Sequence, residues 1–219
     1  PLWSRGLGDV YKRQALINAL MALWMAMIIG GDIVGLTRVF SQIIEGIKTS
    51  HPDMLGSIHL SRDDLATLMS KTAPPMFAAM GVFISVALLW LAALLVKLSG
   101  RLIRPWPDLA MTTMPASILA LTGLSAILSV VFDGFGGLYA RCVLLALVAA
   151  YALEGMGVLL IITRGMALRT SMLSLFAILT LISPPLYGPV VASLALLGII
   201  DRMTGILSLI HISEPTRPE

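Results

Sequence analysis

Residues 76–98 read MFAAMGVFISVALLWLAALLVKL, and this apolar run decides the fold class. Its single charge is Lys97, one residue from the end, where a long side chain can reach the membrane interface while its stem stays in apolar surroundings. A helix of about 20 apolar residues crosses a hydrocarbon core of about 30 Å, because each residue adds about 1.5 Å. The run therefore predicts a transmembrane helix.

Four further apolar runs extend this prediction. Residues 114–132 carry no charge, residues 138–163 hold Arg141 near one end and Glu154 inside, and residues 15–29 form a shorter run. Residues 171–200 would span about 45 Å as one helix, which is too long for a single untilted crossing.

Prolines interrupt the centre of that last run at positions 184, 185 and 189, so it is either one broken helix or a hairpin of two short helices divided at 184–185. Ser183 and the adjacent prolines supply a stop and a restart, which favours the hairpin. Together the runs predict an all-α, polytopic transmembrane helical bundle with five or six membrane segments.

The composition excludes an ordinary soluble domain. Hydrophobic residues make up 58% of the chain and charged residues 12%, and the mean hydropathy is +0.93. A net charge of +3 is too small to indicate nucleic-acid binding. Cys142 is the single cysteine, which excludes an internal disulfide framework and a cysteine metal cluster.

The two ends of the chain are related at the nucleotide level. A DNA sequence that encodes SRGLGDVYKRQ (Ser4 to Gln14) encodes LSLIHISEPTR (Leu207 to Arg217) when its opposite strand is read. This inverted repeat resembles a translated sequencing adapter. We therefore expect residues 1–14 and 207–219 to be adapter-like, and residues 15–206 to be an integral membrane domain truncated at both ends.

The one sizeable polar stretch, residues 30–74, contains two helical patterns. Apolar residues recur at steps of three and four, which predicts an amphipathic helix at the membrane surface; they are Ile33, Leu36, Phe40, Ile43 and Ile47. Ser61 and Asp64 resemble a capping box and predict the start of a second, short helix before the 76–98 span.

Basic residues beside the spans predict the orientation. Lys97, Arg101 and Arg104 follow one span, and Arg164 and Arg169 follow another, with Asp108 as the one acid among them. Loops rich in lysine and arginine lie on the cytoplasmic side. The turn at Asp133 and residues 30–74 are then expected on the opposite side.

Glu154 is the candidate ligand-binding residue, because a carboxylate inside a membrane is costly unless it is protonated, paired or facing a cavity. Ala146, Ala150 and Gly157 share its helical face, so another helix can approach closely there. Two interpretations stay open: a substrate-binding or proton-binding carboxylate, and an interhelical hydrogen bond that holds the packing.

The segment SGRLIRPWPD, Ser99 to Asp108, supplies candidates for contact with a cytoplasmic partner or with lipid: Arg101, Arg104 and Trp106. The alternative is structural, with Trp106 as an interfacial anchor and the arginines as orientation signals.

Enzyme and metal motifs are missing from the sequence. His51, Asp53 and His59 match no established ligand spacing, and DGFGG (Asp133 to Gly137) lacks the lysine of a phosphate-binding loop and reads as a tight turn. No nucleophile elbow or HExxH motif occurs. We expect no enzyme activity, no cofactor and no metal site.

Three segments carry a family resemblance: WLAALLVKLSGRLIRPWPDL (Trp90 to Leu109), ALEGMGVLLIITRG (Ala152 to Gly165) and ALLGIID (Ala195 to Asp201). Together they resemble the YybS-like family of predicted bacterial integral membrane proteins, in its alphaproteobacterial branch. The family is expected to carry glutamine where this chain has Glu154.

The resemblance implies a multi-pass protein of the bacterial cytoplasmic (inner) membrane with more spans than this chain contains. The family has no settled role and is grouped, distantly, with the substrate-binding S components of energy-coupling-factor vitamin transporters. A small-molecule binding or transport subunit is therefore one hypothesis, and a non-transporting structural or assembly protein is the other. The expected partners are the lipid bilayer and a membrane or cytoplasmic protein, not nucleic acid.

Overall fold

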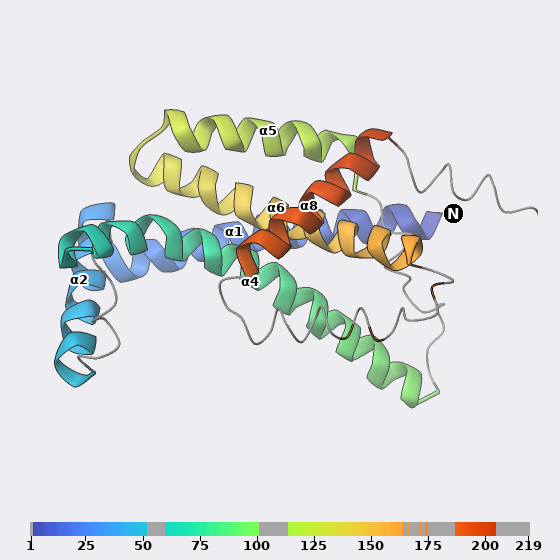
Figure 1. Ribbon diagram of the computed structural model, residues 1–219, viewed down its shortest axis with the longest axis horizontal. Coiled ribbons are helices and arrows are strands. Elements are labelled where there is room, and N and C mark those ends of the chain that lie inside the picture. Colours follow the sequence, from blue (N-terminus) through green and yellow to red (C-terminus); the bar gives the residue numbers. More distant parts are fainter. Residues whose placement is uncertain are drawn as a thin grey trace, which may run out of the picture. The chain divides into compact units, whose positions relative to one another are not determined.

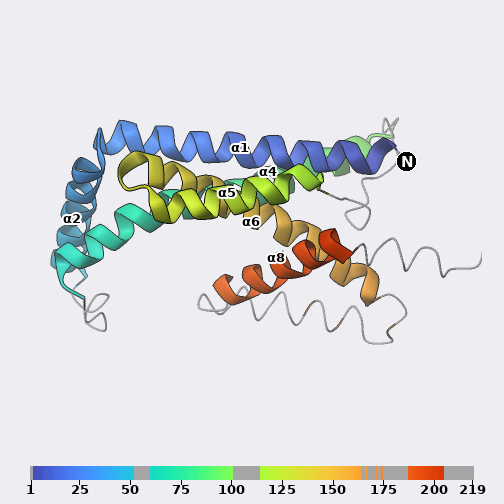
Figure 2. The same ribbon diagram turned by 90° about the horizontal axis from the view of Figure 1, so that it is seen from above.

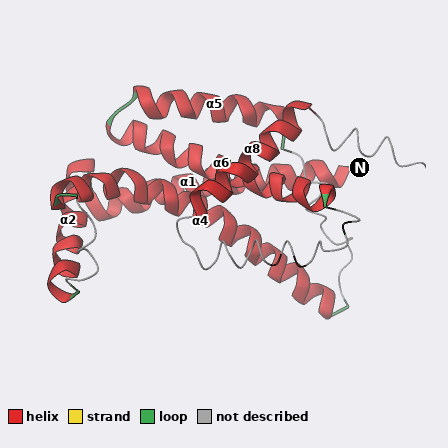
Figure 3. Ribbon diagram, viewed as in Figure 1, coloured by secondary structure: helices red, strands yellow, loops and turns green. Residues whose placement is uncertain are grey.

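The computed structural model describes residues 2–51, 60–100, 114–163, 166, 171, 174 and 187–204, with side chains from residue 10 onward. All regular structure in these ranges is helical (Figure 3). The helices, labelled as in Figure 1, are α1 (Leu2–Gly30), α2 (Ile33–Ser50), α4 (Arg62–Leu98), α5 (Ala116–Val131), α6 (Gly134–Ile162) and α8 (Tyr187–Thr204). The all-α prediction is confirmed for the described part of the chain.

Three of the helices are long and apolar enough to cross a membrane: Val10–Gly30 within α1, Arg62–Leu98 and Gly134–Ile162. The apolar helix α5 is shorter than the predicted span 114–132. It begins only after Pro115, and its 16 residues measure about 24 Å. The described residues therefore contain three candidate spans, where five or six segments were predicted for the chain. Residues 175–186, including the proposed division at 184–185, lie outside the described residues.

Side-chain size is distributed as expected for helices in lipid. Alanines at steps of three and four form the buried face of α1: Ala15, Ala19, Ala22 and Ala26. Large apolar side chains point outward from α1 and α4, among them Trp24, which is 58% exposed, and Leu95, which is 60% exposed. Small residues at the contacts let helix backbones approach closely, and large exposed apolar residues suit lipid and not water.

The corner between α1 and α2 is built by Gly31 and Asp32. Gly31 has φ +70° and donates its backbone N–H to Met27 O at 2.8 Å, which ends α1. Asp32 then caps α2, because its Oδ1 accepts the Gly35 N–H at 2.5 Å. Figures 1 and 2 both show α2 turned sharply away from the end of α1.

The predicted cap at Ser61 is confirmed, since Asp64 donates its N–H to Ser61 Oγ at 3.2 Å. The prediction of a separate short helix is wrong, because α4 continues through Pro74 and Pro75 as one helix of 37 residues. A proline removes one helical hydrogen bond, and within a long apolar helix the remaining bonds and packing outweigh that loss.

The turn predicted at Asp133 to Gly137 is shorter than expected, because α6 already begins at Gly134. Gly134 has φ +70°, a conformation that glycine adopts without strain. A side chain on Gly137 would meet the carbonyl oxygen of Phe132. The glycines therefore allow α5 and α6 to join through Phe132 and Asp133 alone.

The helices group into two compact units, and α1, α4, α5 and α6 each contribute to both. One unit comprises residues 14–82 and 121–146. In it, α1, α2 and α6 form a small core of Ala26, Leu36 and Leu138. Thr37 Oγ1 of α2 donates to Ser70 Oγ of α4 at 3.0 Å.

The other unit comprises residues 1–13, 83–120 and 147–219. Its described core contains the second half of α6 and the helix α8. Val158 and Ile161 form an apolar cluster on α6, and Leu194 and Ala195 are the buried apolar residues of α8. This unit contains Glu154.

Candidate functional site

Glu154 is fully enclosed, with 1% of its surface exposed. The residues that the sequence placed on its face, Ala146, Ala150 and Gly157, are also buried. Protein therefore encloses this face of α6 around Glu154. The prediction that this carboxylate points into the bundle is confirmed.

One oxygen of Glu154 has a hydrogen-bond partner and the other has none. Oε1 accepts the backbone N–H of Met114 at 3.2 Å. Met114 precedes Pro115 and the first turn of α5, where a backbone N–H has no intrahelical acceptor. Oε2 has no hydrogen-bond partner among the described residues. Since a carboxylate offers about four acceptor positions, most of this capacity is unused.

Two glycines bring α8 against α6 beside Glu154. A side chain on Gly155 would meet Leu194 O, and a side chain on Gly198 would meet Tyr151 O. The two helix backbones therefore touch, which is the packing that small residues allow. The sequence predicted a close approach on this face, but the closest contact is made by Gly155 and not by a residue of the predicted set.

This crossing places Asp201 and Arg202 near Glu154. Both lie within electrostatic range of its carboxyl group, Asp201 repelling the negative charge and Arg202 attracting it. Asp201 is 3% exposed, and the Arg202 Nε is buried with no hydrogen-bond partner among the described residues. Glu154, Asp201 and Arg202 are named here the α6–α8 charge cluster.

Sequence reasoning used Asp201 only as part of a family motif and gave Arg202 no role. The argument that singled out Glu154 applies equally to Asp201, an acid that ends an apolar run three residues after a glycine. What the sequence could not show is that the helices carrying the two acids cross at Gly155 and Gly198.

The remaining predicted contacts, Arg101, Arg104 and Trp106, lie outside the described residues, as do Asp53 and His59. His51 is described, exposed, and caps the end of α2. No group of three metal-ligating side chains occurs within the described ranges.

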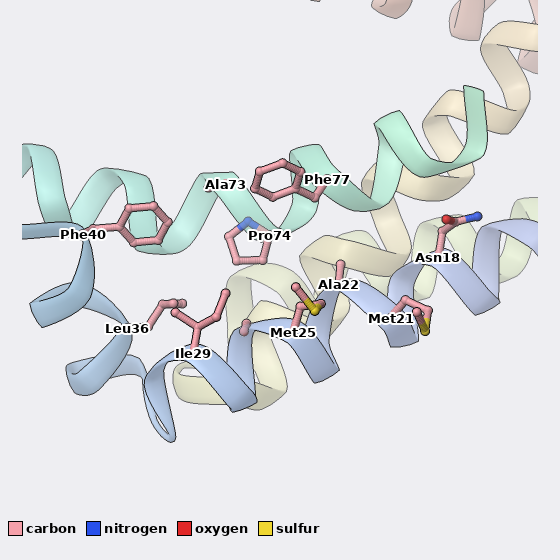
Figure 4. A pocket seen from close by; sticks show the side chains of 11 residues that line it. Asn18, Met21, Ala22, Met25, Ile29, Leu36, Phe40, Ala73, Pro74 and Phe77 are labelled. Atoms are coloured by element: carbon pink, nitrogen blue, oxygen red, sulfur yellow. The ribbon is translucent and has the colours of Figure 1, made fainter. Parts of the chain in front are cut away.

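A separate apolar groove of about 330 Å³ lies between α1, α2 and α4. Figure 4 shows Met21, Met25 and Phe77 among its lining side chains, with Asn18 as its polar residue. Gly81 leaves room for Asn18, because a side chain at Gly81 would meet Asn18 Oδ1. Methionines give such a surface an adaptable shape.

Comparison with models of known protein families, with curated proteins and with solved structures finds no match. The assignment of function therefore depends on the chemistry of the α6–α8 charge cluster and on the sequence.

Proposed function

We propose that this chain is a membrane-embedded binding or transport subunit for a small molecule. The main support is the unpartnered Oε2 of Glu154, a buried carboxylate oxygen inside a helix long and apolar enough to cross a membrane. Ionisable groups at such positions are costly and concentrate along substrate and ion paths. The resemblance to the YybS-like family and its distant grouping with S components points the same way.

Ligand-induced thermal stabilisation tests this proposal. The full chain is purified in detergent, and its Tm is recorded with each member of a panel of vitamins and small metabolites. A ligand at about 100 times its Kd adds about 2.7 kcal/mol to the stability of the folded state. We expect at least one compound to raise the Tm, and the rise to shrink in Glu154→Gln.

Glu45→Gln is the matched control, because Glu45 is exposed and pairs with Arg62 on the surface. Its response to the compound should equal that of the unsubstituted chain. A panel without a single stabilising compound would overturn the proposal.

A structural or assembly role is the second candidate, favoured by the hydrogen bond between Glu154 and Met114. Such a bond joins α6 to the segment before α5 without requiring a ligand. The basic segment that contains Arg101 and Arg104 would then dock a cytoplasmic partner. Under this function Glu154→Gln leaves activity in cells intact, and replacement of both arginines by alanine weakens recovery of the partner in a pull-down.

A further inference from the structure

We propose that the α6–α8 charge cluster binds one proton, held on Oε2 of Glu154 and stabilised by the negative charge of Asp201 nearby. The inference deepens the proposed function and rests on it in one respect, since the proton affects ligand binding only if a ligand binds. It assigns a role to Asp201, which the proposed function leaves without one.

The charge balance of the cluster calls for one positive charge. Two carboxylates and one guanidinium leave a net charge of −1 when all three groups are ionised. Glu154 and Asp201 are 1% and 3% exposed, so water compensates little of this charge. Two acids in a shared site of low polarity do not both ionise readily, and a proton on one of them removes the repulsion.

Hydrogen bonding identifies Glu154 as the acid that takes the proton. Its Oε2 has no donor among the described residues, so the ionised form leaves a buried acceptor unsatisfied. Protonation forms an O–H bond at Oε2 and turns that oxygen into a donor, while Oε1 continues to accept the Met114 N–H. Deprotonation breaks the same O–H bond and releases the proton to solvent.

The ligand set favours a proton over a metal ion. A metal ion needs several oxygen ligands, and no group of three metal-ligating side chains occurs among the described residues, whereas a proton needs one oxygen. The charged side chains that act on Glu154 are Asp201 and Arg202 of α8, and the titratable Tyr151 lies one turn earlier on α6. The Met114 segment contributes a backbone N–H.

Infrared spectroscopy of the full chain in lipid nanodiscs tests the inference. A protonated carboxyl group has a C=O stretch separate from that of a carboxylate, and it shifts in D₂O. We expect this band near neutral pH, with a further shift when glutamate alone carries ¹³C. The label restricts the band to the four glutamates of the chain, of which Glu154 is the one within the three candidate spans.

Variants then separate the members of the cluster. Glu154→Gln should lose the whole band, Asp201→Asn should shift its pH midpoint, and Asp133→Asn, in the exposed turn before α6, should leave it unchanged. A labelled chain without the band near neutral pH, or with a band that responds to labelled aspartate and not to labelled glutamate, would overturn the inference.

The outcomes are separable from those of the ligand panel. A band without any stabilising compound keeps the proton site and removes the transport function. A stabilising compound without the band keeps the transport function and removes the proton site.

Discussion

At the scale of single residues, Glu154 takes part in two interactions, a hydrogen bond and an electrostatic one. Its Oε1 satisfies the Met114 N–H, which would otherwise be a buried donor without an acceptor. Its carboxyl group also lies within electrostatic range of Asp201 and Arg202 of α8. The first contact depends only on an acceptor oxygen and the second depends on charge, so different substitutions separate them.

Glu154→Ala should destabilise the fold more than Glu154→Gln. Alanine leaves the Met114 N–H unsatisfied, at a cost of about 1–3 kcal/mol, and also creates a cavity. Glutamine keeps an acceptor oxygen of nearly the same size. Unfolding of the detergent-solubilised chain, followed by circular dichroism, measures both variants. Equal losses for the two would contradict a hydrogen bond to Met114 that stabilises the fold.

Ser61 has a smaller, local effect at the start of α4. Ser61→Ala removes the acceptor for the Asp64 N–H and should cost about 1 kcal/mol. Because the site is exposed, the change should appear as faster hydrogen exchange in the first turn of α4. Ser41→Ala is the control, since Ser41 caps no helix and its hydroxyl bonds only to Arg38 O. Equal exchange in both variants would refute the cap.

At the scale of elements, the contact between α6 and α8 depends on two glycines. A methyl group at Gly155 would meet the backbone of α8, where no flexible side chain can move aside. Glycine inside a helix otherwise costs roughly 0.5–1 kcal/mol relative to alanine. At Gly155 this cost is offset by the close helix packing that glycine permits.

Gly155→Ala should therefore lower the Tm, although alanine is the better helix former. Gly123→Ala, inside α5, is the matched control, because a side chain there meets nothing within 4 Å. The control should be neutral or slightly stabilising. Thermal unfolding of both variants in one detergent provides the comparison, and a stabilised Gly155→Ala would show that the two backbones do not touch.

At the scale of the whole molecule, the basic loops predict the orientation in the membrane. Cysteine labelling suits this chain, because Cys142 is the single cysteine and is 0% exposed. In intact cells, a membrane-impermeant maleimide should label Asp133→Cys and should reach Ser99→Cys only after permeabilisation. The opposite result would invert the orientation inferred from Lys97, Arg101 and Arg104.

Much of the helical content could be predicted from local patterns. The apolar run 76–98, the steps from Ile33 to Ile47 and the cap at Ser61 depend on residues close in sequence. Helix lengths were less predictable: Pro115 shortened α5, while Pro74 and Pro75 did not divide α4. Pro115 lies before the first turn of α5, where no intrahelical hydrogen bond is lost, whereas Pro74 and Pro75 remove bonds inside α4. Inside a helix, the surrounding packing decides whether the helix continues.

The sequence by itself predicted helices apolar enough to cross a membrane, and it singled out one member of the candidate site. Apolar composition and run length predict helices for a membrane, and the cost of a charge in an apolar run singles out Glu154. Tertiary structure alone decided what surrounds that carboxylate. Met114, Asp201 and Arg202 come from distant positions: Met114 donates its N–H to Glu154, and the close approach of α6 and α8 at Gly155 and Gly198 brings Asp201 and Arg202 near it. Such a contact depends on the fit of two helix surfaces, which no local pattern encodes.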